Sequence, residues 1–171
     1  VVTGRNPASS QISEHRYSYF KVEFSNLEET AAIIKKICRY YSFDMVIDNA
    51  GVLSPPDFTL TDDNLEYSFE ANFLANLLVN EIIIRNTDAG HPLTVAAITS
   101  LVYRIAPKDL ISGTHKNDYK PLKAYSNSKL YLALMCSHLP ARYPNMKLNC
   151  IGIDPGVFSS GIYRMQKPWF R

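Results

Sequence analysis

Tyr125-Ser-Asn-Ser-Lys129 begins the longest helical pattern in the chain. Apolar residues follow it at spacings that give a helix a broad apolar face: Leu130, Leu132, Ala133, Leu134, Met135 and Leu139. A tyrosine and a lysine four residues apart share one helix face, about 5–6 Å apart at Cβ. A nearby ammonium favours the phenolate and lowers the pKa of a tyrosine. Such a phenol can exchange a proton with an oxygen atom near neutral pH.

The spacing of Tyr125 and Lys129 occurs four more times, so the surrounding sequence has to select among the pairs. The others are Tyr17/Lys21, Tyr119/Lys123, Tyr143/Lys147 and Tyr163/Lys167. The first lies in a strand-like alternation, prolines interrupt the next two, and Pro168 follows the last. We therefore predict the chemistry at Tyr125 and Lys129.

Size and composition predict one domain over residues 1–171, with 46% hydrophobic residues to form its core. The 18 basic and 16 acidic residues form no run of like charge, which argues against a nucleic-acid partner. Cys38, Cys136 and Cys150 lack metal-ligand spacing, and we expect no metal site. No apolar run reaches the roughly 18 residues that a membrane span needs.

Strand-like and helix-like patterns alternate along the chain. We expect strands at 1–4, 17–24, 44–51, 93–100 and 147–153, and helices after Asn26, from Asn64 to Arg85, and from Tyr125 to Arg142. Asn26 is the expected cap of the first helix, and Thr61 or Asp62 that of the second. Between the strand at 93–100 and the third helix, residues 101–122 are long enough to form a functional loop.

This alternation predicts an α/β fold, a mostly parallel, doubly wound Rossmann-like sheet with helices on both faces. Ligands bind such sheets beyond the carboxyl ends of the strands. The expected strand ends are Gly4, Asn49-Ala50-Gly51, Thr99-Ser100 and Pro155-Gly156. All candidate site residues at strand ends then lie along one edge of the sheet.

Several of these motifs, in this order, resemble the short-chain dehydrogenase/reductase superfamily: Asn49-Ala50-Gly51, Asn72, Ser100, Tyr125-x-x-x-Lys129 and Pro155-Gly156. Thr114-His-Lys-Asn-Asp-Tyr119 and Asp154-Pro-Gly-Val157 are most similar to the retinol dehydrogenase and WW-domain oxidoreductase branch. The resemblance covers the chain from Val1 to about Tyr163. It implies hydride transfer between a nicotinamide cofactor and an alcohol or carbonyl substrate of retinoid, steroid or lipid type.

The resemblance also implies a role for each residue. Tyr125 is the general acid/base, and Lys129 lowers its pKa and binds the nicotinamide ribose. Ser100 orients the substrate oxygen, and Asn72 holds a water molecule in a proton relay to Lys129. Cofactor contacts are implied for Tyr125 and Lys129 and for a set of residues at the sheet edge: Gly4, Asn49, Ala50, Gly51, Pro155, Gly156, Val157 and Ser160.

The amino-terminal part departs from the family pattern. A dinucleotide site needs a glycine-rich turn, whose amides reach the pyrophosphate at a helix N-terminus. Here Gly4 is followed directly by Arg5-Asn-Pro-Ala8, as if that turn, a helix and a strand were deleted. Arg5 favours NADP over NAD, and Asn26 replaces the aspartate that the family presents to adenine. The family's last helix and strand are also missing after Tyr163.

The departures leave two functions open. One is an NADP-dependent oxidoreductase, and the alternative is an inactive truncated isoform that acts as a scaffold or pairs as a dimer through the Tyr125 and Asn64 helices. Individual motifs also have purely structural interpretations. Asn49-Ala50-Gly51 can form a turn, Ser100 a helix cap and Pro155-Gly156 a chain reversal, and Asn72 can be a buried helix asparagine. The resemblance leaves the location open between the cytoplasm and the endoplasmic reticulum.

Overall fold

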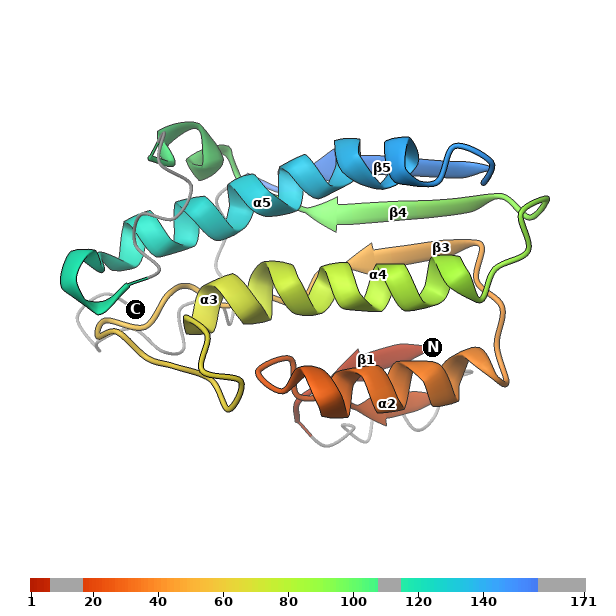
Figure 1. Cartoon of the computed structure of the whole chain (residues 1–171), viewed down its shortest axis with the longest axis horizontal. Coiled ribbons are helices and arrows are strands. Elements are labelled where there is room, and N and C mark those ends of the chain that lie inside the picture. Colours follow the sequence, from red (N-terminus) through yellow and green to blue (C-terminus); the bar gives the residue numbers. More distant parts are fainter. Residues whose placement is uncertain (7–16, 108–114, 157–171) are drawn as a thin grey trace.

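The computed structural model describes residues 1–6, 17–107 and 115–156 (Figure 1). Its strands are β1 (Val2–Gly4), β2 (Tyr19–Lys21), β3 (Met45–Asp48), β4 (Leu93–Ile98) and β5 (Leu148–Ile153). Its longer helices are α2 (Leu27–Cys38), α4 (Ala75–Arg85) and α5 (Pro121–Arg142). The short α3 (Tyr67–Phe69) and the π-helical turn η1 (Glu70–Leu74) lead into α4, and two 3-10 turns, η2 (Leu101–Ile105) and η3 (Lys116–Asp118), precede α5.

Parallel strand pairing confirms the predicted α/β, Rossmann-like fold. β3, β4 and β5 form one sheet in that order, and β1 pairs with β2 in a second sheet. The described helices α2, α4 and α5 lie side by side on one face of these strands (Figure 1). Within the described residues the opposite face carries no helix, although the sequence led us to expect helices on both faces. Met45, Ile47, Ile151 and Ile153 are exposed there.

The sheet is divided between β1 and β3. Within the described residues, β1 pairs only with β2 and has no strand neighbour on the side of Met45–Asp48. The physical reason is that β1 has three residues, whose hydrogen bonds go to β2, and the described chain has no further strand for the space beside β3. The gap that follows is part of a large cavity.

Local capping decides where the helices begin. Asn26 caps α2 as predicted, accepting the Glu29 N–H at 2.8 Å. The next helical segment begins at Tyr67 and not at Asn64, and its cap is neither Thr61 nor Asp62. The Glu66 carboxylate accepts the N–H groups of Ser68 and Phe69, while Asn64 has a left-handed φ of 60°. A carboxylate at this position satisfies amides that the helix leaves unpaired.

The third long helix, α5, begins at Pro121, four residues earlier than expected from Tyr125. Proline suits the first turn because its missing N–H has no partner there. The core lies between the helices and the strands and contains Ile37, Ile84, Leu93, Leu132 and Leu139, which are almost fully buried. In the described part of the chain, no helix has both the length and the apolar character to cross a membrane.

Candidate active site

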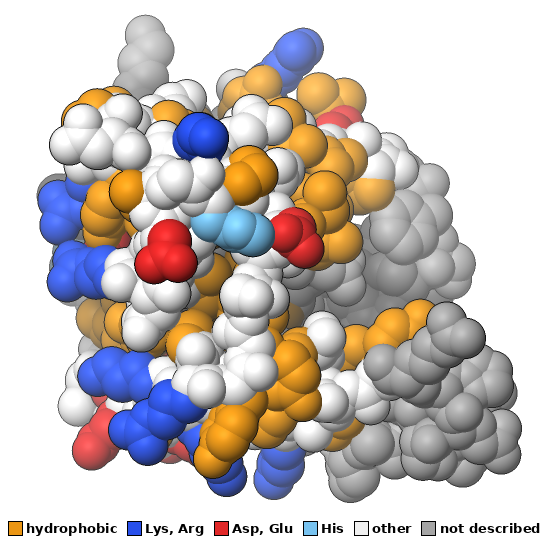
Figure 2. Space-filling view, turned by 90° about the vertical axis from the view of Figure 1, so that its right-hand side faces the viewer, with side chains coloured by type: hydrophobic (Ala, Val, Ile, Leu, Met, Phe, Trp, Pro, Cys, Tyr) orange, Lys and Arg blue, Asp and Glu red, His pale blue; other side chains and the backbone are white. Residues whose placement is uncertain are grey.

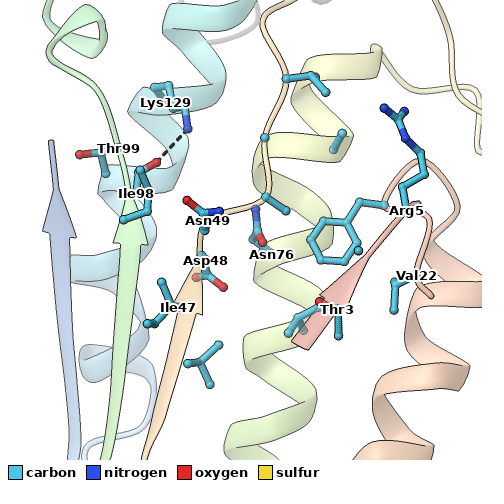
Figure 3. A pocket seen from close by; sticks show the side chains of 18 of the residues that line it. Thr3, Arg5, Val22, Ile47, Asp48, Asn49, Asn76, Ile98, Thr99 and Lys129 are labelled. Carbon is cyan, nitrogen blue, oxygen red and sulfur yellow. Dashed lines mark hydrogen bonds between the residues drawn. The ribbon is translucent and has the colours of Figure 1, made fainter. Parts of the chain in front are cut away.

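A cavity of about 980 Å³ lies at the carboxyl ends of the strands and extends into the gap between β1 and β3. Most residues that the sequence placed at the site line it: Gly4, Arg5, Asn49, Ala50, Gly51, Ser100, Tyr125, Lys129, Pro155 and Gly156. In Figure 3, Lys129, Thr99 and Asn49 lie on one side of the cavity, and Thr3 and Arg5 lie across it. The fold therefore brings these residues together from four strand ends and one helix.

Tyr125 and Lys129 project from the first half of α5 and are buried, with exposed fractions of 8% and 4%. The Lys129 Nζ lies 5.8 Å from the centre of the Tyr125 ring and donates a 2.8 Å hydrogen bond to the carbonyl oxygen of Ile98 (Figure 3). Burial disfavours the ammonium and lowers the Lys129 pKa to about 8. The ammonium is thus held beside the phenol, as the four-residue spacing predicts.

Asn72 lies in η1, where one residue more than in a regular α-helix fits into the turn. Its side chain accepts the Val52 N–H at 2.7 Å and donates to the Val52 carbonyl and to Ser128 Oγ, both at 2.9 Å. Its backbone carbonyl accepts the side-chain amide of Asn76 at 2.8 Å. Asn72 thus ties the segment after β3 to α5, which matches the structural interpretation of a buried helix asparagine.

Gly51 separates Asn72 from Lys129. A Cβ atom at Gly51 would lie 3.4 Å from the Asn72 Oδ1 and 3.6 Å from the Lys129 Nζ. The missing side chain therefore leaves open space between the amide oxygen and the amine, on the wall of the cavity. A ligand can approach the Asn49-Ala50-Gly51 backbone closely at this point.

Ser100 follows β4 and caps η2. Its hydroxyl accepts the Val102 N–H at 3.5 Å, a long and weak bond, and Ser100 also lines the cavity. The preceding Thr99 fixes the strand end, because its hydroxyl donates to the Ile153 carbonyl at 3.1 Å. Ser100 is therefore placed to exchange its weak capping bond for a bond to a ligand.

Arg5 borders the cavity on the β1 side. Its guanidinium donates to the Tyr67 hydroxyl at 3.1 Å and lies 3.8 Å from the Glu23 carboxylate. Asn26, predicted to meet adenine, uses its side-chain oxygen to cap α2 and does not line the cavity. Val157 and Ser160 lie outside the described residues.

The sequence reasoning missed a group of polar residues on the cavity wall and behind it. Asp48 and Asn76 line the cavity, and Asn80 donates a 2.7 Å hydrogen bond to the Asp48 carboxylate. Burial raises the Asp48 pKa to about 7. The available signal was the spacing of Asn72, Asn76 and Asn80, which places three amides on one helix face. Among the described residues, no cluster of histidine, cysteine and carboxylate side chains could hold a metal ion.

Comparison with known proteins shows the family. Human retinol dehydrogenase 13 is 31% identical over 117 residues, which are 67% of this chain and 34% of that protein. Human polyprenol dehydrogenase is 28% identical over 128 residues, 70% of this chain and 38% of that protein. The chain belongs to the short-chain dehydrogenase/reductase superfamily. No protein-family model matches the sequence.

A solved member of this superfamily also shares the fold. The short-chain dehydrogenase from Sphingobium yanoikuyae in complex with NADPH superposes with a TM-score of 0.64 at 16% identity, over 86% of this chain and 54% of that one. The chain spans between a third and two fifths of the length of the two human relatives, retinol dehydrogenase 13 and polyprenol dehydrogenase. None of these relatives favours the alternative function, that of an inactive isoform acting as a scaffold or dimer partner.

Proposed function

We propose that the chain is an oxidoreductase that uses NADP and transfers hydride to or from an alcohol or carbonyl carbon of a retinoid, steroid or other lipid-like substrate. The observation that carries the proposal is the buried Lys129 ammonium, 5.8 Å from the Tyr125 ring on the wall of one cavity with Ser100. An ammonium, a phenol and a hydroxyl around one space are the groups that proton transfer to a carbonyl oxygen requires.

The residues present fit the nicotinamide half of the cofactor. Lys129, Asn49 and Pro155 supply polar groups and backbone around open space, and Gly51 leaves room for close approach. On the β1 side, Arg5 supplies a cation for a 2′-phosphate, a planar donor suited to phosphate oxygens. When bound, the cofactor supplies the hydride donor or acceptor.

Proton transfer is the task of the chain's own residues. In the reducing direction the Tyr125 phenol gives its proton to the carbonyl oxygen as that oxygen gains negative charge. Lys129 stabilises the resulting phenolate, and the Ser100 hydroxyl donates to the same substrate oxygen. In the oxidising direction the phenolate removes the alcohol proton, by microscopic reversibility. Asn72 holds Val52 and Ser128 in place, and a water molecule beside Gly51 would connect Lys129 to Asn72.

The cavity lining supports the proposed substrate class. Apolar side chains of Leu53, Val102 and Leu122 line the cavity together with the polar groups, as in sites for lipid-like molecules. Retinol and polyprenol, which name the two human relatives, are alcohols of this kind.

Cofactor titration tests the proposal. The purified chain is titrated with NADPH and with NADH while nicotinamide fluorescence is followed, and the folded state is checked by circular dichroism. Saturable binding with preference for NADPH supports the assignment. A folded sample that binds neither cofactor would exclude it.

A further inference from the structure

We propose that Glu70 is a proton-sensitive switch, which holds residues 60–66 against the start of α2 when it is protonated and releases them when it is ionised. These residues form the loop that leads into α3. The proposal adds a regulatory device to the fold and does not depend on the oxidoreductase assignment. It rests on the bonds of the loop, on the burial of Glu70 and on the acidic side chains near it.

The loop is a turn with few hydrogen bonds of its own. Leu60 and Glu66 pair as an antiparallel bridge at its ends, and the Thr61 N–H donates to the Leu65 carbonyl at 2.9 Å. The Asn64 N–H donates to the Thr61 carbonyl at 3.1 Å. So few bonds do not offset the conformational entropy that the ordered residues lose. The loop therefore depends on its attachments to neighbouring elements.

Two side-chain bonds attach the loop to its surroundings. The Asp63 carboxylate accepts the Leu27 N–H at 2.8 Å, which satisfies an amide in the first turn of α2. The Thr61 hydroxyl donates to a carboxylate oxygen of Glu70, at the start of η1. Figure 1 shows the loop reaching from the start of α3 toward the start of α2. Both attachments use carboxyl groups, and they are therefore sensitive to charge.

Glu70 is a buried carboxyl group without a basic partner among the described residues. Its exposed fraction is 0%, and its Oε1 atom has no hydrogen-bond partner in the described structure. Other carboxylates lie beside basic groups. Figure 2 shows acidic, basic and histidine side chains together on one end of the molecule, and Glu81 contacts Arg85 and Arg142 at 2.9 and 3.0 Å. A buried carboxylate without such a partner is costly, so Glu70 favours its protonated form.

The neighbours of Glu70 also affect its proton. Burial is the largest cause that raises the Glu70 pKa, the Thr61 hydrogen bond lowers it, and the charges of Asp63 and Asp62 raise it, so that the pKa is about 7. The Asp63 carboxyl is also close enough to share a hydrogen bond with Glu70. Such a bond between two carboxyl groups requires one proton. In the part of the chain that the structure describes, no group of three or more acidic, histidine or cysteine side chains could hold a metal ion in place of that proton.

The proton links docking of the loop to pH. The ordinary pKa of Glu70 is 4.5, and its pKa in the folded chain is about 7, so between these values the docked loop binds more protons than the released loop. Docking then weakens by up to about tenfold for each pH unit across this window and levels off above it. Ionised Glu70 repels Asp63, and water solvates both carboxylates once the loop is released.

Glu70 lies beside the wall of the cavity. It begins η1, where its carbonyl accepts the Ala75 N–H, and η1 also holds Asn72. Ala71, the residue that follows Glu70, lines the cavity. Ionisation of Glu70 therefore acts on the segment that carries Asn72, and the switch links pH to the shape of the cavity.

Hydrogen exchange in the full chain, followed by NMR from about pH 5 to pH 8.5, tests the switch. The Leu27, Thr61 and Asn64 amides are all hydrogen bonded in the docked loop or to it. After correction for the intrinsic pH dependence of exchange, their protection should fall at least about tenfold from pH 5 to pH 7 and change little above pH 8. Protection that does not change with pH would overturn the proposal.

Two variants identify the titrating group. Glu70→Gln keeps an acceptor for the Thr61 hydroxyl and adds a permanent donor toward Asp63, so protection should stay near its pH 5 value throughout. Asp62→Asn is the matched control, because it removes an exposed carboxylate of the same loop and leaves Glu70 and Asp63 in place. The fall with pH should persist in that control. Equal pH dependence in the two variants would overturn the proposal, since the titrating group would not be Glu70.

A titration of the wild type tests the proposal without a substitution. The side-chain carboxyl carbon of Glu70, assigned through its backbone amide, is followed by NMR as the pH is raised. It should titrate with a midpoint of about 7, and the chemical shift of the Leu27 amide should move with the same midpoint. A midpoint near the ordinary value of 4.5 would overturn the switch.

Discussion

The Lys129 ammonium is hydrogen bonded to the carbonyl oxygen of Ile98, at 2.8 Å. This bond joins helix α5 to the carboxyl end of strand β4, directly before Thr99 and Ser100. The strand therefore fixes the amine beside Tyr125 and beside the residue proposed to orient the substrate.

Lys129 should make stability depend on pH in the alkaline range. Its pKa falls from 10.5 to about 8 in the folded chain, so between these values the unfolded chain binds more protons. Stability should then rise with pH across this window through Lys129. Unfolding by urea at several pH values, compared between the wild type and Lys129→Met, measures the contribution. The free energy of unfolding of the wild type relative to that of Lys129→Met should rise as pH increases from 8 to 10. If the difference in the free energy of unfolding between the two proteins did not change with pH, Lys129 would not be a buried amine that titrates in this range.

Asp48 should have the opposite effect in the acidic range. Burial raises its pKa from 3.8 to about 7, so the folded chain binds more protons between these values and stability falls as pH rises through them. Asp48→Asn keeps an acceptor for the Asn80 amide and adds a donor for the Asn80 Oδ1, a buried atom without a hydrogen-bond partner in the described structure. The variant should match the wild type below pH 4 and exceed it by about 1–4 kcal/mol at pH 8. Thermal unfolding at both pH values tests this, and a variant less stable at pH 8 would contradict it.

Asn72 should be a large contributor to stability. Asn72→Ala leaves the Val52 N–H and carbonyl without their bonds and removes one bond from Ser128, so we expect a loss of about 2–4 kcal/mol. Asn86→Ala is a control at the end of the same helical segment, where a single bond to the Ile82 carbonyl is lost. That variant should lose about 1 kcal/mol or less. Equal losses in urea unfolding would show that the Asn72 bonds do not hold the loop.

Arg5 should determine the preference for NADPH. Arg5→Ala should raise the Kd for NADPH about tenfold or more and change that for NADH little, since the lost bond is to a phosphate. Glu23→Gln should lower the Kd for NADPH, because the carboxylate lies 3.8 Å from the guanidinium and competes with a phosphate. Tyr67→Phe controls for the loss of the 3.1 Å bond between Arg5 and Tyr67. If Arg5→Ala raised the Kd values for NADPH and NADH equally, Arg5 would not be the group that binds the 2′-phosphate.

The sequence predicted the elements well where local chemistry decides them. Helix α2 and its Asn26 cap follow from an asparagine, two acidic residues and an apolar periodicity. The juxtaposition of Tyr125 and Lys129 follows from their spacing once the helix is recognised. The starts of the other helices were missed, because Glu66 caps with a longer side chain than the residues usually found there, and Pro121 starts α5.

What the sequence could not predict depends on distant contacts. The division of the sheet arises from the pairing of β1 with β2 alone, which no local pattern of residues 1–4 indicates. The bonds of Asn72 join residues 20 and 56 positions apart, and the π-helical turn that holds it has no sequence signature. The anchoring of Lys129 to Ile98 likewise crosses 31 positions.

The most direct test of the central claim is NADPH oxidation in the presence of all-trans-retinal or a ketosteroid, with the wild type and Tyr125→Phe compared under identical conditions. Loss of a positioned general acid/base costs about 100- to 10,000-fold in rate. We predict turnover by the wild type and a loss of this size in the variant, with NADPH affinity unchanged. Turnover retained in Tyr125→Phe, or none in a wild type that binds NADPH, would contradict the account.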